Sequence, residues 1–200
     1  MTSERQILFF GGSFDPLHIG HTSLLNCIYY AAPYAIDEIW LVPTFQNPLK
    51  EKIVMSFEER VSLLSKVFCE DRRFHICHIE EELPLPHYTI DTLSALEKKH
   101  PSYRFTILIG ADNWVTFDQW YHHDLLLKKY RIFIYPRRGF DIQKEYLPQG
   151  VYYLDYLPLI EVSSTQIRQA IIEGRDLRYL LPLPTQYSQL EIAYKKRSTL

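Results

Sequence analysis

The chain has 200 residues, of which 46% are apolar and 23% charged, a composition typical of one globular domain. The formal net charge of −2 gives no overall attraction to nucleic acid or to a membrane surface, so we expect neither as a partner. Three cysteines, Cys27, Cys69 and Cys77, are odd in number and lack the spacing of a zinc site. No signal-peptide pattern opens the chain and no run reaches the ~18 apolar residues of a membrane helix. We therefore expect free thiols and a cytoplasmic protein. The sequence leaves open whether the protein forms a homo-oligomer.

Apolar strand-like runs alternate with helical patterns along the chain. We expect strands over 6–10, 38–42, 74–79, 104–109, 131–135 and 151–154. We expect helices over 18–32, 56–68, 89–99, 124–129, 164–173 and 185–195. This alternation predicts an α/β fold, a Rossmann-like doubly wound parallel sheet with helices on both faces. We expect a single domain over 1–200 that ends in a small C-terminal helical part, at about 164–195.

Local signals mark three of the expected helix ends. Ser56 is followed three residues later by Glu59, which predicts a capping box. Thr89 precedes an apolar helical pattern and is expected to cap it. Gly174 follows the pattern at 164–173 and is expected to stop that helix.

The segment between the first expected strand and helix is the most informative part of the chain. It reads Gly11-Gly12-Ser13-Phe14-Asp15-Pro16-Leu17-His18-Ile19-Gly20-His21. The two histidines are three residues apart, so they share one face at a helix start. Helix starts expose unpaired N–H groups and favour phosphate, and glycines leave room for a ligand to approach the backbone. The pattern predicts a phosphate site with two imidazoles beside it.

This segment resembles the signature of nucleotidylyltransferases with an HxGH motif, and within them the bacterial nicotinate-mononucleotide adenylyltransferase family. The resemblance extends to segments in the family's order and spacing: 87–93 (HYTIDTL), 109–113 (IGADN), 120–121 (WY), 136–139 (PRRG) and 162–168 (VSSTQIR). The chain departs from the family at Asn47-Pro48-Leu49-Lys50, where leucine replaces a histidine, and at His87, where serine is usual.

The resemblance implies transfer of AMP from ATP to nicotinate mononucleotide, which gives deamido-NAD and pyrophosphate. The attacking phosphate is already ionised, so positioning and charge stabilisation are expected to do most of the catalysis. We expect the histidines to bind the ATP phosphates, with nearby phosphate favouring their charged form. The expected catalytic residues are His18, His21, Arg168 and Lys50. The expected ATP-binding residues are Gly11, Gly12, Ser13, Phe14, Asp15, His18, Gly20, His21, Ser164, Thr165 and Arg168, with loop ordering as the preferred role of Asp15.

For nicotinate mononucleotide, the resemblance implies the residues Tyr88, Thr89, Asp112, Trp120, Tyr121 and Arg137. The aromatic pair is expected to stack on the pyridine ring, and the helix start at Tyr88 to favour its carboxylate. We expect Mg²⁺ to arrive with ATP, because no cage of His, Cys or carboxylate ligands is visible in the sequence. The alternatives are a nicotinamide mononucleotide or phosphopantetheine adenylyltransferase, or a nucleotide sensor without turnover.

Overall fold

A computed structural model describes residues 4–45 and 53–198 of the chain. Its strands are β1 (Arg5–Gly12), β2 (Glu38–Pro43), β3 (Phe74–Ile76), β4 (Tyr103–Gly110), β5 (Arg131–Tyr135) and β6 (Val151–Tyr153). Its helices are α1 (Ile19–Ala31), α2 (Phe57–Phe68), α3 (Thr89–Lys99), α4 (Ala111–Trp114), α5 (His123–Lys129), α6 (Ser164–Ile172) and α7 (Tyr187–Ser198). All six expected strands and six expected helices are present.

The six strands form one parallel sheet in the order β3-β2-β1-β4-β5-β6. The chain moves outward from β1 to β3 and then returns to the other side of β1 at β4. In such sheets, ligands bind beyond the carboxyl ends of the strands where the order reverses. That place is the end of β1 and β4, and it is where the Gly-rich segment and Gly110 lie.

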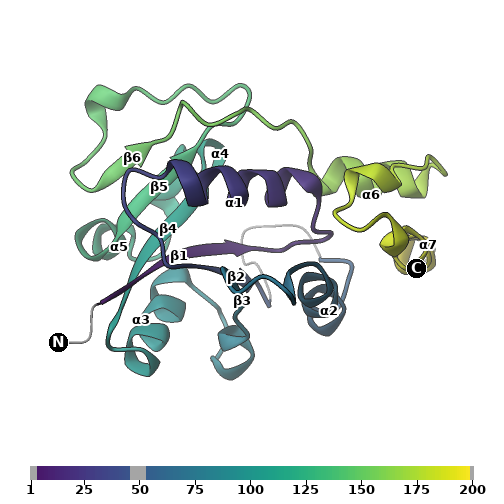
Figure 1. Ribbon diagram of the computed structural model, residues 1–200, viewed down its shortest axis with the longest axis horizontal. Helices are drawn as coiled ribbons and strands as arrows, with labels where there is room; N and C mark the ends of the chain where they lie inside the picture. Colours follow the sequence, from purple (N-terminus) through teal and green to yellow (C-terminus); the bar gives the residue numbers. More distant parts are fainter. Residues whose placement is uncertain (1–3, 46–52, 199–200) are drawn as a thin grey trace.

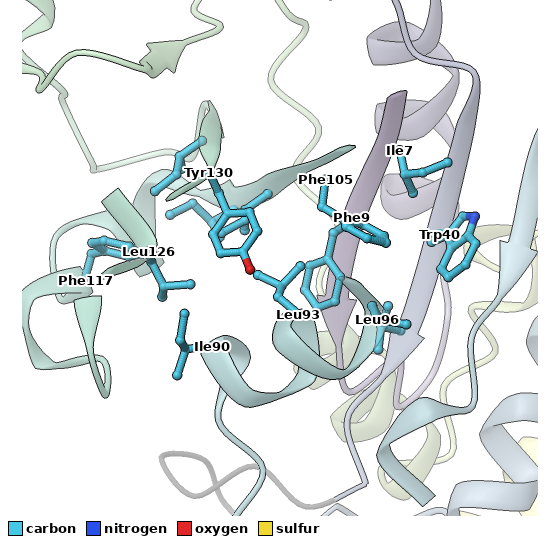
Figure 2. Close-up of a cluster of buried hydrophobic side chains, with 14 of the residues drawn as sticks. Ile7, Phe9, Trp40, Ile90, Leu93, Leu96, Phe105, Phe117, Leu126 and Tyr130 are labelled. Atoms are coloured by element: carbon cyan, nitrogen blue, oxygen red, sulfur yellow. The ribbon is translucent and has the colours of Figure 1, made fainter. Parts of the chain in front are cut away.

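Both faces of the sheet are covered, because the central strands are apolar on both sides. From β1, Leu8 and Phe10 join the cluster that contains Leu25 and Ile28 of α1. Ile7 and Phe9 point to the opposite face, into a cluster with side chains of α3 and α5. Figure 1 shows α1 and α3 on opposite sides of β1. Figure 2 is a close-up of the cluster that contains Ile7 and Phe9. The doubly wound arrangement expected from the sequence is confirmed.

A third apolar cluster joins the C-terminal helices to the start of α2. Its buried members are Met55, Leu63, Ile167, Ile171, Leu181, Tyr187, Leu190 and Tyr194. In Figure 1, α6 and α7 lie beyond the end of β1, next to the loop that leaves that strand. The C-terminal helices therefore pack near the carboxyl end of β1, where the Gly-rich segment lies.

Some local expectations are confirmed and others are wrong. Ser56 and Glu59 form the capping box, with Ser56 Oγ accepting from the Glu59 N–H at 3.2 Å. Gly174 follows α6 with φ +75°, a left-handed backbone that glycine adopts without strain. Thr89 is not the cap of α3: Tyr88 holds that position with an extended backbone, and its side chain makes no capping hydrogen bond.

Two element ends also differ from the expectation. β3 ends at Ile76 and the chain turns into a 3-10 helix at Ile79–Glu82, because the Glu80 carboxylate folds inward to backbone and side-chain donors. The last helix begins at Tyr187, after a 3-10 turn at Pro184–Gln186 whose start suits the fixed φ of proline. The short α4, directly after β4, was not expected.

Candidate functional site

The two histidines of the Gly-rich segment lie one above the other at the start of α1. Their ring centroids are 3.7 Å apart and the rings are tilted by 29°. His18 is the N-cap residue, and its backbone N–H donates to Nδ1 of His21 at 3.2 Å. An Nδ1 that accepts a hydrogen bond carries no proton, so neutral His21 has its proton on Nε2. The capping bond thus fixes the tautomer of His21.

His18 is buried, with 2% of its surface exposed. Burial, with a smaller contribution from the positive charge of Arg137, lowers the pKa of His18 to about 3. Without nucleotide the buried ring is therefore neutral near pH 7, and the charged form that nearby phosphate would favour stays a prediction. Its Nδ1 has no hydrogen-bond partner in the described part of the chain.

Gly20 is required by the fold of this segment rather than only by a ligand. A Cβ at this position would lie 2.9 Å from both Cε1 and Nδ1 of His18, and 3.3 Å from the carbonyl oxygen of Val162. The His18 ring is therefore packed directly over the first turn of α1. Gly12 is similarly close to the ring of Phe14, whose nearest atom would be 3.2 Å from such a Cβ.

Asp15 orders the loop between β1 and α1, which was its preferred role. Its carboxylate accepts hydrogen bonds from the Val54 N–H at 2.8 Å, the Met55 N–H at 3.3 Å and the Tyr194 hydroxyl at 2.8 Å. The residue before it, Phe14, has φ +47°, a conformation that non-glycine residues rarely adopt and that needs support from its surroundings.

Backbone carbonyls of the same loop are held by two arginines and a serine. Arg60 Nη1 donates to the Ser13 carbonyl at 2.8 Å, and Arg168 Nη1 donates to the Asp15 carbonyl at 2.7 Å. Ser164 Oγ donates to the Pro16 carbonyl at 2.9 Å. The structure therefore brings the second motif against the first. It uses the Ser164 hydroxyl and part of the Arg168 guanidinium to hold the loop.

The sequence analysis missed two residues here: Arg60, which contacts the loop, and Ser163, which caps α6. Arg60 is buried among apolar residues of α2, and this burial lowers its pKa. Ser163, not Ser164, caps α6, with its side chain accepting from the Gln166 N–H at 3.2 Å. An arginine on the apolar stripe of a predicted helix was the available signal for Arg60, since such a side chain is buried only with partners.

Two charged side chains follow the ends of β4 and β5, Asp112 after β4 and Arg137 after β5. Arg137 lines the same pocket as His18 and His21, and its Nη2 donates to the Tyr135 hydroxyl at 2.8 Å. Arg137 Nε lies 3.6 Å from Asp112 Oδ1, an ion pair without a hydrogen bond. The pocket also includes Leu24 and Ile160. Arg137 was expected at the mononucleotide, but the structure places it beside the histidines.

The expected pyridine site is built differently from a simple aromatic pair. Tyr121 stacks on Tyr88, with centroids 4.3 Å apart and 29° between the rings, and is 48% exposed. Trp120 is half-buried and packs on Phe117 at 5.2 Å. The two consecutive aromatics thus have different partners. Thr89 lies beside Tyr88, in the first position of α3.

The expectations for Lys50, for metal ligands and for membrane helices are compared with the described residues in turn. Lys50 lies outside the described residues, as do Asn47, Pro48 and Leu49. Within residues 4–45 and 53–198, no group of three or more His, Cys, Asp or Glu side chains could hold a metal ion. The described helices include none with the length and apolar character that a bilayer crossing requires.

Comparisons with known proteins agree with this geometry. The model of the cytidylyltransferase-like family matches residues 9–170. A protein from Porphyromonas gingivalis named probable nicotinate-nucleotide adenylyltransferase is 49% identical over 88% of this chain and 89% of its own length. A protein of the same name from Bacteroides fragilis is 38% identical over 90% of this chain and 89% of its own.

Solved structures show the same fold. The nicotinic acid mononucleotide adenylyltransferase of Plasmodium falciparum, complexed with NaAD, has a TM-score of 0.75 and 21% identity, covering 98% of this chain and 97% of its own. A putative nicotinate-nucleotide adenylyltransferase from Vibrio parahaemolyticus has a TM-score of 0.67 and 21% identity, covering 93% and 98%.

Proposed function

The chain belongs to the cytidylyltransferase-like family, and we propose that it transfers AMP from ATP to nicotinate mononucleotide. The stacked pair of His18 and His21, at the carboxyl end of β1 and facing Arg137, is the observation that carries this proposal. These groups surround a place where phosphate oxygens can accept hydrogen bonds. The names of relatives that match almost the whole chain support the same reaction.

The reaction joins two anions, so the protein has to position them and stabilise charge. A phosphate oxygen of nicotinate mononucleotide attacks the α-phosphorus of ATP, and the bond from that phosphorus to the bridging oxygen breaks. The electron pair leaves with pyrophosphate. Because the attacking oxygen is already ionised, no side chain has to remove a proton, and catalysis is mainly positioning and electrostatics.

We assign the histidines and arginines to the phosphates. His21 donates from Nε2, since its Nδ1 is occupied by the His18 N–H. His18 donates to phosphate from a ring nitrogen, and the nearby phosphate favours its charged form. Arg168 keeps N–H groups beyond the two that hold Asp15 and Thr165, and these are available to the outer phosphates of ATP. Backbone of Gly11, Gly12, Ser13 and Phe14 borders the nucleotide, and Lys50 is assigned to the triphosphate.

We assign the start of α3 to the nicotinate carboxylate. No side chain caps this helix in the described structure, so its first N–H groups can bind an anion. A carboxylate gains from the partial positive charge there, whereas a neutral amide gains less. Tyr88 and Tyr121 offer aromatic faces beside this position, and Asp112 is assigned to a ribose hydroxyl.

Magnesium is part of the proposal as a companion of ATP. The Asp15 carboxylate is already occupied by three donors, and residues 4–45 and 53–198 contain no group of three or more metal-ligating side chains. The ion would be held by phosphate oxygens and water, where it offsets negative charge. We propose that the reaction takes place in the cytoplasm, where free thiols such as those of Cys27, Cys69 and Cys77 are typical.

A substrate panel tests the proposal directly. The purified protein is incubated with ATP, Mg²⁺ and one of nicotinate mononucleotide, nicotinamide mononucleotide or phosphopantetheine, and both pyrophosphate and the dinucleotide product are measured. We expect the highest kcat/KM with nicotinate mononucleotide. A higher value with either other acceptor would overturn the substrate assignment. Binding of ATP with no pyrophosphate from any acceptor would instead indicate a nucleotide sensor.

A further inference from the structure

Tyr194 connects the last helix to the loop between β1 and α1. It lies on α7, beyond residue 170, where the match to the family model ends. Only 1% of its surface is exposed, and its hydroxyl donates to Asp15 Oδ1 at 2.8 Å. In Figure 1, α7 lies below α6, beyond the end of β1. A side chain near the C-terminus thus contacts a loop that is 179 residues away in sequence.

The contact with Tyr194 matters for the site because the Asp15 carboxylate joins three segments: its own loop, residues 54–55 and α7. Tyr194 and the Met55 N–H share Oδ1, and the Val54 N–H donates to Oδ2. Met55, Leu63, Ile167 and Leu190 are all buried in the same apolar cluster as Tyr194, and the guanidinium groups of Arg60 and Arg168 lie nearby. Water does not readily replace a hydroxyl donor in such a place, so removing the donor leaves the carboxylate less satisfied.

The loop that Asp15 belongs to has little freedom to compensate. Phe14 has a positive φ, and His18 lies packed over Gly20, only three residues after Asp15. A change in the position of Asp15 is therefore passed along the loop to the two imidazoles. Burial also raises the pKa of the Tyr194 hydroxyl, which keeps it protonated as a donor at ordinary pH.

We propose that Tyr194 is a positioning residue for adenylyl transfer, which acts through Asp15 to hold the loop that carries His18 and His21. The proposal rests on the proposed function, because it is the assigned phosphate site that the loop presents. Tyr194 itself touches neither substrate. The C-terminal helix, in this view, is part of the catalytic structure as well as of the fold.

The chain offers a matched control on the same helix. Tyr187 also lies on α7, is 6% exposed, and its hydroxyl donates to the Arg175 carbonyl at 2.9 Å. Within the described residues, this hydroxyl has no hydrogen bond to the loop. Tyr194→Phe and Tyr187→Phe each remove one buried oxygen atom from α7. A purely structural role would make the two variants behave alike.

The experiment compares the two variants with the parent by steady-state kinetics, at a temperature where all three are folded. For Tyr194→Phe we expect kcat to fall ~10-fold or more, since small misplacements of catalytic groups are costly. For Tyr187→Phe we expect kcat within about twofold of the parent, in keeping with its distance from the phosphate site. Equal kcat values for all three proteins, or an equal loss in both variants, would overturn the proposal.

A second measurement separates this inference from the proposed function. Amide hydrogen exchange is followed in peptides covering 13–18 and 54–55. We expect faster exchange there in Tyr194→Phe than in Tyr187→Phe. If the parent makes no dinucleotide, the proposed function fails. The exchange data then still decide whether Tyr194 holds the loop, and unchanged exchange would refute that.

Discussion

The charge state of His18 illustrates how one buried side chain sets a pH dependence. Its pKa is about 3 in the folded protein, mainly because burial disfavours the imidazolium, whereas an unfolded chain has a value near 6.5. The unfolded state therefore binds more protons between these two values, and stability falls as the pH is lowered through this window. Above about pH 6.5 the residue is neutral in both states and contributes no pH dependence.

The prediction is tested by urea unfolding of the parent and of His18→Asn, since asparagine also suits an N-cap position. Between pH 6 and pH 4, the parent should lose about 1.4 kcal/mol more per pH unit than the variant. All other titrating groups are common to the two proteins, so the difference isolates His18. Parallel stability curves would show that His18 is not held neutral.

His21 is the residue where loss of a single donor should affect turnover most clearly. His21→Ala removes both the Nε2 donor and the acceptor for the His18 N–H. We expect kcat to fall by ~10²–10³, the usual cost of removing one preorganised donor. His21→Gln keeps an acceptor at the third helical position, as in a capping box, and should retain the parent's melting temperature. Full activity in His21→Ala would contradict the donor role.

Gly20→Ala should not stabilise the protein, although replacing glycine by alanine usually stabilises a helix. In a helix interior this substitution usually stabilises by about 1 kcal/mol. Here the new Cβ would lie 2.9 Å from the His18 ring and 3.3 Å from the Val162 carbonyl, so the ring must move. We expect no gain in melting temperature and at least a ~10-fold loss of kcat/KM for ATP, because the displaced imidazole no longer meets the phosphates. A more stable and fully active variant would refute this reasoning.

At the scale of elements, Glu80 joins the turn after β3 to two other parts of the fold. Its carboxylate accepts from the Phe45 N–H at 2.8 Å and from Thr92 Oγ1 of α3 at 3.3 Å, and lies 3.8 Å from Nδ1 of His87. Burial raises the pKa of Glu80. This carboxylate holds the segment after β2 against α3.

Removal of Glu80 should therefore be more harmful than neutralising it. Glu80→Ala leaves the Phe45 N–H without its acceptor, whereas Thr92 Oγ1 can still donate to the Tyr88 carbonyl at 3.2 Å. A buried unsatisfied group costs about 1–3 kcal/mol. Glu80→Gln keeps one side-chain oxygen and should lose clearly less. Chemical denaturation of both variants at pH 7 gives the two free energies of unfolding, and an equal loss would argue against the hydrogen-bonding role.

The strands and helices were predictable, because the periodicity of apolar residues and local capping signals specify them. Alternating strands and helices gave the doubly wound sheet, and the capping box at Ser56 and the glycine after α6 were visible in the sequence. The ends that were wrong depend on distant partners. β3 stops early because Glu80 turns inward, and no signal near residue 76 reveals Phe45 or Thr92 as its partners.

At the scale of the whole molecule, the site was predictable as a set of motifs but not as a set of contacts. The motifs at 11–21 and 162–168 do come together, as expected from their resemblance. What could not be predicted is that Ser164, Arg168 and Tyr194 hold the loop itself. Hydrogen bonds between residues 148 to 179 positions apart follow from the complete packing, for which no local spacing is a guide.

The charges of the protein and of its two substrates predict that turnover requires Mg²⁺. The protein is slightly acidic, and both substrates are polyanions, so the arginines and imidazoles of the site face a large excess of negative charge. Magnesium bound to the ATP phosphates would supply the missing positive charge. We therefore expect turnover to disappear in excess chelator and to return when Mg²⁺ exceeds the chelator, while the melting temperature without nucleotide stays unchanged, since the described residues build no metal cage. Full turnover in excess chelator would contradict the metal requirement, and a chelator-dependent melting temperature would point to a metal site in the protein itself.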